Sequence, residues 1–453
     1  MKGIYLGNAP IAGAEIGGKS GMVFRDGEPY FNIADYQAMA PFFIAVVSGS
    51  EHWMFISSTG GISCGRRNPD HARFPYDTDD KIPEAGSTTG SKTILLVERD
   101  GRNHLWTPYD QGVSPYRIER NLYNNQHGNR LVFEEINHDL ELVFSYSWST
   151  GDRFVFVKRS MLQNIGGAEC AVEIIDGVRN VLPYGATRRM QNELSTLLDA
   201  YKQVERVPGL TAGVFSLSSI LTDRAEPCEA LKSSVVWSIG LDDPAVLLSE
   251  DQLPAFCAGD AVSPESGKRG KRCAFFVHST FSMAPGEDRS WYVVADIDQG
   301  SARLPSLLRN IRQGIAPEEI EADIDAGAHR LMQLVGGSDG CQHSSDTLVA
   351  ARHFSNTLFN IMRGGTFCDV YRFPLDDFLD FAGVWNKPLR EKFSGRLTAE
   401  DGQVTLDAVM RVAEESGDTD MERLALEYLP LIFSRRHGDP SRPWNQFSID
   451  IKN

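Results

Sequence analysis

The period of the hydrophobic residues changes near residue 300, and this change constrains the fold more than any other feature. Before it, β-branched and aromatic residues alternate with polar ones, and Gly, Asn and Asp separate the runs. This pattern predicts strands at 42–47, 53–57, 93–98, 130–136, 140–148, 154–158, 170–175, 214–218, 234–239, 274–278 and 291–296. After residue 300, apolar residues recur every three or four positions. That spacing predicts helices at 317–336, 345–363, 375–384, 404–413 and 421–433.

Many strands joined by short turns indicate packed antiparallel sheets in the first part of the chain. The polar turn Asn137, His138 and Asp139 joins two predicted strands, so we expect an antiparallel hairpin there. Only residues 188–204 have helical spacing in this part. The predicted fold is therefore β followed by α. It comprises an antiparallel β-sandwich domain at 1–300, a helical linker at 301–370 and a helical segment at 371–453.

The charge of the chain excludes some classes of partner. The 453 residues carry 45 basic and 61 acidic side chains, a formal net charge of −16. Such a surface repels phosphate backbones and anionic lipid, so we expect neither nucleic acid nor membrane as a partner. No apolar run is long enough for a membrane span, and Gly7, Asn8 and Pro10 interrupt any signal-like start. We expect a cytoplasmic protein.

Several familiar motifs are absent or out of context. Residues 13–20 fit the G-x-x-x-x-G-K-[ST] phosphate loop, but strand-like residues 22–24 follow where that loop requires a helix. We therefore favour a glycine-rich turn between strands. The histidines have no metal-binding spacing, the seven cysteines include no C-x-x-C, and no G-x-S-x-G elbow occurs. The sequence predicts no metal and no cofactor.

Two polar and aromatic segments are candidates for sugar chemistry. Residues 74–81 gather three carboxylates beside an aromatic ring, as paired-carboxylate catalysis requires, although a solvated acidic turn is the better interpretation. Trp106, Tyr109 and Asp110 combine flat rings with a carboxylate, which suits the apolar faces and the hydroxyls of a pyranose. Packing of Trp106 in the core is an equally good interpretation.

A basic segment near the C-terminus is a candidate anion site. Arg435, Arg436, His437 and Arg442 lie within eight residues of an otherwise acidic chain, and guanidinium groups suit phosphate or carboxylate. The alternative is structural: the first two arginines would end a helix and Arg442 would pair with Asp439. Both interpretations stay open.

Six segments together resemble a known family. They are residues 30–36, 55–61, 74–81, 106–108, 352–359 and 438–445, and their order is similar to the N-terminal region of cellobiose-phosphorylase-like proteins of the glycoside hydrolase family 94 type. The resemblance implies a galactose-mutarotase-like β-supersandwich, a helical linker and then an (α/α)6 six-hairpin barrel that holds the active site. It also implies that Trp444 and Asn445 correspond to a Trp-Asn pair at the barrel entrance.

The resemblance leads to a functional hypothesis. In the family, the catalytic acid and the residues that grip the sugar lie further along the barrel, so we expect this chain alone to be inactive. A barrel in cis or in trans would complete it. The implied reaction is inverting phosphorolysis of a β-glucoside or oligosaccharide with inorganic phosphate as co-substrate, with hydrolysis still open. A homodimer is implied as well. The alternative is a stand-alone carbohydrate-binding or scaffold module.

Overall fold

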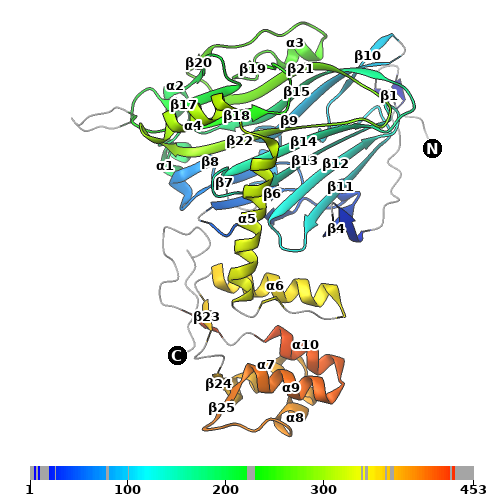
Figure 1. The fold of residues 1–453 in the computed structure, drawn as a ribbon, viewed down its shortest axis with the longest axis vertical. Coiled ribbons are helices and arrows are strands. Elements are labelled where there is room, and N and C mark those ends of the chain that lie inside the picture. Colours follow the sequence, from blue (N-terminus) through cyan, green and yellow to red (C-terminus); the bar gives the residue numbers. More distant parts are fainter. Residues whose placement is uncertain are drawn as a thin grey trace. The chain divides into compact units, whose positions relative to one another are not determined.

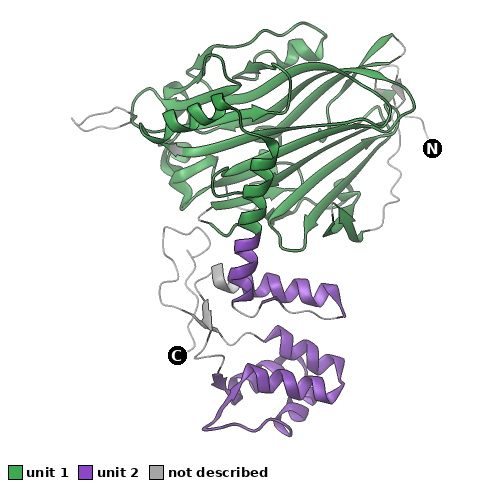
Figure 2. Cartoon of the chain, in the orientation of Figure 1, with its two compact units in different colours: residues 1–328 green, residues 329–453 purple. Residues whose placement is uncertain are grey.

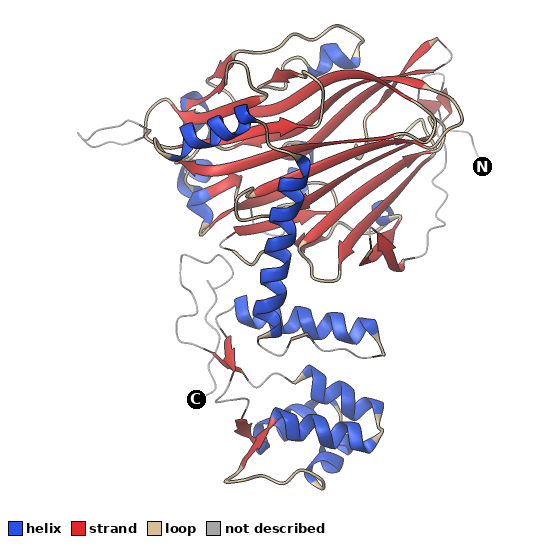
Figure 3. Cartoon of the chain, in the orientation of Figure 1, coloured by secondary structure: helices blue, strands red, loops and turns tan. Residues whose placement is uncertain are grey.

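The computed structural model describes residues 5–6, 9–10, 20–25, 27–50, 52–77, 81–99, 101–221, 230–337, 340–341, 345–362, 365–367, 372–428 and 431–433. The chain divides into two compact units, Met1–Ala328 and His329–Asn453 (Figure 2). The strands dominate the first unit and the helices the second (Figure 3).

A large antiparallel sheet of eleven strands dominates the first unit (Figure 1). Its strands in spatial order are β20 (Gly267–Arg269), β16 (Lys202–Arg206), β17 (Ala212–Leu217), β18 (Ser233–Ile239), β22 (Asp288–Gln299), β14 (Phe156–Asn164), β13 (Leu142–Ser149), β12 (Arg130–Asn137), β11 (Ile118–Asn125), β4 (Glu28–Ala34) and β3 (Gly21–Arg25). The predicted hairpin is confirmed, since β12 and β13 pair in register from Arg130 opposite Ser149 to Asn137 opposite Leu142.

Besides a short pair of strands, β1 (Tyr5–Leu6) with β2 (Ala9–Pro10), two smaller antiparallel sheets accompany the large one. One has the order β10 (Arg102–Trp106), β9 (Gly90–Arg99), β15 (Cys170–Val181), β21 (Cys273–Met283) and β19 (Ala245–Leu247). The other has the order β5 (Phe43–Ala45), β6 (His52–Ser57), β7 (Ile62–Arg66) and β8 (Ala72–Phe74). One apolar core joins all three sheets, with members such as Phe144, Ile174 and Phe74. Alternation along each strand directs these side chains inward, which makes the unit a β-sandwich.

Helices cover parts of the outward faces. Helix α3 (Leu253–Cys257) packs Phe256 against the outward side of the five-stranded sheet. Helices α4 (Arg303–Gln313) and α5 (Pro317–Gly336) pack against the outward side of the large sheet, where Ile320 and Ile324 meet Trp237 and Val294. The predicted helix at 317–336 is therefore confirmed. Its first turn carries two glutamates, which the helix dipole favours.

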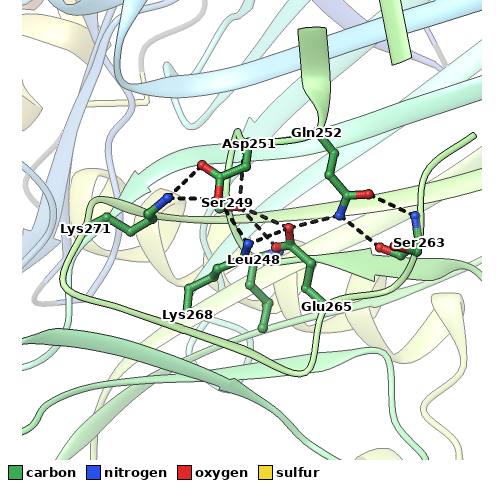
Figure 4. A network of polar contacts seen from close by, with 8 residues as sticks. All are labelled: Leu248, Ser249, Asp251, Gln252, Ser263, Glu265, Lys268 and Lys271. Carbon is green, nitrogen blue, oxygen red and sulfur yellow. Dashed lines mark hydrogen bonds and ion pairs between the residues drawn. The ribbon is translucent and has the colours of Figure 1, made fainter. Parts of the chain in front are cut away.

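Residues 264–272 contain β20, the edge strand of the large sheet, and a polar network holds this segment (Figure 4). Buried Glu265 accepts hydrogen bonds from the backbone N–H of Leu248 (2.7 Å) and from Gln252 (3.0 Å). Asp251 binds both Lys268 (3.0 Å) and Lys271 (2.8 Å), and these hydrogen bonds lower its pKa to about 2. The hydrogen bonds of these two carboxylates thus hold the segment in place.

The predicted helix at 188–204 is shorter than expected. It is broken into α1 (Arg188–Glu193) and α2 (Ser195–Tyr201), with Leu194 outside helical geometry at φ −131°. The chain then enters β16, because Val204 is fully buried in the sandwich core. Core packing therefore overrides the helical pattern at its C-terminal end.

The second unit is mainly helical. Its helices after α5 are α6 (Thr347–Met362), α7 (Leu375–Trp385), α8 (Lys387–Ser394), α9 (Leu406–Ser416) and α10 (Thr419–Glu427). Short pairs of strands accompany them, β23 (Gly365–Phe367) with β26 (Leu431–Phe433) and β24 (Arg372–Pro374) with β25 (Gln403–Thr405). Phe378, Phe393 and Met421 are central to a separate apolar core. The order of sheets before helices is as predicted, whereas the start of an (α/α)6 barrel and the boundaries at 300 and 370 stay predictions.

Candidate functional site

A hollow lies on the outward face of the large sheet, and β13 explains why it forms. Residues of β13 alternate between large and small: Tyr146 and Trp148 point into the core, while Ser145, Ser147 and Ser149 point outward. Three short side chains in a row leave empty space between the longer side chains of the neighbouring strands. We call this hollow the serine trough.

The strands on either side supply the walls of the trough. By register, Arg130 and Val132 on β12 stand opposite Ser149 and Ser147, and Arg159 on β14 also stands opposite Ser147. The cavity has a volume of about 430 Å³ and lies within the first unit. Its lining comprises Arg25, Tyr30, Arg130, Val132, Ser145, Ser147, Ser149, Val157, Arg159, Met161, Gln163, Asp288, Glu321 and Ile324.

Helix α5 is fixed beside the trough by an apolar stripe and by acidic residues on either side of it. Ile320 and Ile324, one turn apart, are buried against the sheet. On one side of this stripe, Glu319 binds the Arg153 guanidinium (2.9 Å). On the same side, the Asp323 carboxylate accepts hydrogen bonds from the backbone N–H groups of Arg153 (3.0 Å) and Phe154 (2.8 Å). The carboxylates thus satisfy backbone donors where a loop of the sheet turns.

On the other side of the stripe, Glu321 lines the trough and Asp325 pairs with one of the arginines that line it. Glu321 accepts a hydrogen bond from the Tyr292 hydroxyl (2.7 Å) and lies 3.7 Å from Arg130 and 3.8 Å from Arg159. Asp325 lies 3.3 Å from Arg130. Burial, and then the hydrogen bond to Glu321, raise the pKa of the Tyr292 hydroxyl above its ordinary value, so it remains a hydrogen-bond donor to Glu321. The guanidinium groups of this wall therefore have carboxylate partners.

A second carboxylate cluster lies on the same face of the sheet. Glu134, which stands opposite Ser145, accepts hydrogen bonds from the Tyr123 hydroxyl (2.6 Å), from Arg25 (2.9 Å) and from Asn121 (3.3 Å). The Arg25 guanidinium also stacks over the Tyr123 ring, 4.1 Å from its centroid. Arg25, the third arginine that lines the trough, therefore has Glu134 as its carboxylate partner.

Three buried polar atoms on this face have no hydrogen-bond partner among the described residues. They are Nε of Arg159 and the Oδ1 atoms of Asn32 and Asn121. Buried polar atoms in folded proteins are nearly always paired with protein groups, water or ligand. The outward face of the sheet therefore has hydrogen-bonding capacity that the described protein groups leave unused.

The structure places the predicted aromatic residues in and near the core. Trp106 is only 2% exposed, and its indole N–H donates to Glu135 (2.7 Å). Tyr109 donates its backbone N–H to the same carboxylate (2.7 Å), and its hydroxyl donates to the carbonyl of Phe144 (2.7 Å). A ring this buried cannot stack on a sugar without leaving the core. For Trp106 the core-packing alternative is thus the better interpretation.

Asp110 is exposed and forms an ion pair with Lys92. It lines a cavity of about 190 Å³ together with Trp106. Arg120 and Glu135, which form a buried ion pair (2.7 Å), line the same cavity. Trp106 and Asp110 thus line one cavity, and sugar binding by Trp106, Tyr109 and Asp110 stays a prediction. The cavity is less than half as large as the serine trough.

The other predicted site residues lie outside the described residues. These are Arg435, Arg436, His437, Arg442, Trp444 and Asn445, and residues 13–19 of the phosphate-loop pattern also lie outside them. Within the described part of the chain, no group of three or more His, Cys, Asp or Glu side chains is arranged to hold a metal ion. Among the described helices, none combines the length and the apolar composition of a membrane span.

One family model matches the second unit. Residues 367–430 match Glycoside hydrolase family 149 insertion domain 1. The matched residues contain α7, α8, α9 and α10. The match concerns this segment alone, and the family it names is 149 and not the family 94 of the sequence resemblance.

Comparison with other proteins adds little. No curated protein matches the sequence. Among solved structures, a bacterial glucoamylase complexed with acarbose is 8% identical with a TM-score of 0.38. The match covers 81% of this chain and 52% of the glucoamylase chain. A proposed kojibiose phosphorylase from the human microbiome is 9% identical with a TM-score of 0.33, and the match covers 78% of this chain and 40% of the phosphorylase. A GalM/aldose epimerase homologue from C. elegans is 10% identical with a TM-score of 0.32, and the match covers 58% of this chain and 100% of the homologue. The chain thus spans about half of the glucoamylase. TM-scores this low establish neither a shared fold nor a shared function.

Sequence reasoning missed the serine trough, although a signal was present. The run Ser145-Tyr146-Ser147-Trp148-Ser149 alternates serine with aromatic residues, which places one small polar residue after another on one face of a strand. A second signal is the acidic run around Ile320 and Ile324, with a carboxylate at every second position. Both patterns gain meaning only once the neighbouring strands are known.

Proposed function

We propose that this chain is a non-catalytic portion of a carbohydrate-active enzyme of the glycoside phosphorylase or glycoside hydrolase type. The observation that carries the proposal is the match of residues 367–430 to an insertion domain of a glycoside hydrolase family. The order of a β-sandwich before helices supports it, because the family resemblance in the sequence implies this order. The catalytic (α/α)6 barrel would be supplied in cis or in trans.

The proposed reaction of the complete enzyme is glycosyl transfer from a β-glucoside or oligosaccharide to inorganic phosphate, with inversion. A carboxylic acid would protonate the leaving oxygen while phosphate attacks the anomeric carbon from the opposite side. In a hydrolase, a carboxylate would instead activate water at that position. Phosphate needs cationic donors rather than a strong base, so we assign Arg435, Arg436, His437 and Arg442 to anion binding.

The remaining assignments of this proposal concern the sugar and the partners. Trp444 and Asn445 would lie at the barrel entrance and contact the sugar. Beyond phosphate, the complete enzyme would use no cofactor and no metal. We further propose a cytoplasmic homodimer.

Turnover assays test the proposal directly. Residues 1–453 are incubated with cellobiose or longer β-glucans, with and without inorganic phosphate, and released sugar phosphate and reducing sugar are measured. We expect no turnover by this chain alone and turnover when a downstream barrel is joined or added. Robust phosphorolysis or hydrolysis by residues 1–453 alone would contradict a non-catalytic role.

A further inference from the structure

We propose that the serine trough is a binding site for a neutral saccharide. The inference rests on the proposed function for the class of ligand and on the geometry of the first unit for the place. It assigns a sugar site to the β-sandwich, at residues distinct from those assigned to the barrel entrance and to phosphate.

The size and the lining of the trough suit a small sugar. Its volume of about 430 Å³ falls within the range of about 300–1,000 Å³ for ligand sites. Serine hydroxyls and guanidinium groups alternate there with the apolar side chains of Val132, Val157 and Ile324. A pyranose offers the complementary mixture, since its hydroxyls bond to polar groups and its C–H faces lie on apolar ones.

The charge balance of the trough favours a neutral ligand over an anion. Each of its three arginines has a carboxylate nearby: Glu134 for Arg25, Asp325 and Glu321 for Arg130, and Glu321 for Arg159. Asp288 adds a further negative charge to the lining. An incoming phosphate would therefore meet no excess positive charge. A sugar hydroxyl donates and accepts at once, so it can bridge a carboxylate and a guanidinium without separating them.

A buried polar atom beside the trough also has no hydrogen-bond partner among the described residues. Nε of Arg159, whose guanidinium lines the trough, is buried and has no acceptor among the described residues. Ser147 stands directly opposite Arg159 in the sheet, and both residues line the trough. A ligand at this point satisfies a donor that the described protein groups leave unused.

The test compares two strand serines of the first unit, half-buried Ser147 in the trough and exposed Ser282 away from it. Ser147→Leu fills the middle of the trough, and Ser282→Leu makes the same change on β21 of the five-stranded sheet. Binding of glucose, cellobiose, maltose and inorganic phosphate is measured by calorimetry. We expect at least one sugar to bind the unaltered chain and Ser282→Leu equally, and Ser147→Leu to weaken it about tenfold or more, as expected when at least one or two hydrogen bonds are lost.

A second variant keeps the test decisive if Ser147→Leu fails to fold. Arg159→Lys retains the charge but removes Nε and the planar fork, so it should weaken sugar binding severalfold with an unchanged melting temperature. Three results would overturn the inference: no sugar of the panel binds, sugar binding is equal in Ser147→Leu and Ser282→Leu, or phosphate binds the trough more tightly than any sugar. Because the readout is binding, these results are independent of the turnover assays.

Discussion

Lys158 and Arg159 are neighbours on β14, yet they lie on opposite faces of the large sheet and in opposite chemical situations. Lys158 is fully buried and lies 2.6 Å from the carboxylate of Asp176, also fully buried. Arg159 is 39% exposed, lies 3.8 Å from Glu321 and has an unpartnered Nε. One face of the strand thus holds a closed polar network and the other an open one. The comparison separates polar groups that stabilise the fold from polar groups available to a ligand.

The closed network is complete around Asp176. One oxygen accepts from Lys158 (2.6 Å) and Thr93 (2.6 Å), and the other from Ser160 (2.9 Å) and Trp291 (2.8 Å). Burial lowers the pKa of Lys158, and the charge of Asp176 opposes this shift. A buried ion pair with this number of partners is costly to break, because either charge alone would be buried without compensation.

The largest predicted effect follows from breaking this network. Asp176→Ala should lower the free energy of unfolding by about 3–5 kcal/mol, because it leaves Lys158 charged and buried without a partner. Urea unfolding monitored by tryptophan fluorescence measures the change. As a control, Lys158→Met combined with Asp176→Leu should cost less than Asp176→Ala alone, since no charge remains in the core. A loss below about 1 kcal/mol for Asp176→Ala would refute the closed-network description.

Asp296 on β22 lies between these two extremes. Its carboxylate accepts from the backbone N–H of Ile297 and from Gln299 (both 2.6 Å), and Arg66 lies 3.9 Å away. Its side chain is only 16% exposed. Burial raises the pKa of Asp296 from its ordinary value of 3.8 to about 6. Asp296 has fewer close hydrogen-bond donors than Asp176, so ionising its buried carboxylate costs free energy.

The second prediction is a pH dependence. Between pH 3.8 and about 6 the folded chain holds the Asp296 proton more strongly than the unfolded chain, so this group lowers stability as the pH rises through that window. The contribution reaches about 3 kcal/mol for a shift of two pKa units and is constant above about pH 7. Asp296→Asn removes it. The difference in unfolding free energy between Asp296→Asn and the unaltered chain should therefore grow in favour of the variant from pH 4 to pH 7, and an unchanged difference would contradict the raised pKa.

The third prediction concerns the acidic contacts of α5. Glu321→Gln keeps an acceptor for Tyr292 but removes the charge beside Arg130 and Arg159, so it should lower the free energy of unfolding by about 1 kcal/mol. Asp325→Asn is the matched control, since Asp325 is 67% exposed and its ion pair should contribute about 0.5 kcal/mol or less. Chemical unfolding of both variants at low and at high salt measures these effects. Equal losses would mean that Glu321 is no better placed than a surface charge.

Much of the fold could be predicted from the sequence, because alternation and helical spacing are local properties. The hairpin of β12 and β13 and helix α5 appear at or close to the expected residues. Strand β11 was missed because Asn121, Asn124 and Asn125 are poor strand formers. Its neighbours β4 and β12 supply the hydrogen bonds that hold it in the sheet.

The candidate site was far less predictable than the fold. The trough depends on β12, β13, β14 and β22 being neighbours, and residues 288–299 join this group from more than 120 positions beyond β14. Pairing at such separation leaves no local trace in the sequence. The sequence predicts sugar binding by Trp106 and Tyr109 from their chemistry. How far each side chain is buried depends on the packing of distant strands, which leaves Trp106 buried and Tyr109 half-buried.

The smallest predicted effect on stability belongs to the trough itself. Ser147→Leu and Ser282→Leu should each change the free energy of unfolding by no more than about 0.5 kcal/mol, because both side chains point away from the core. Thermal and urea unfolding measure this alongside the sugar titrations. If Ser147→Leu stays stable but loses sugar binding, the two faces of the sheet have different roles. Side chains on the core face then stabilise the fold, and side chains on the outward face bind the ligand. A loss of several kcal/mol would instead mean that the trough serines support the fold, and the contrast between Lys158 and Arg159 would then be one of degree.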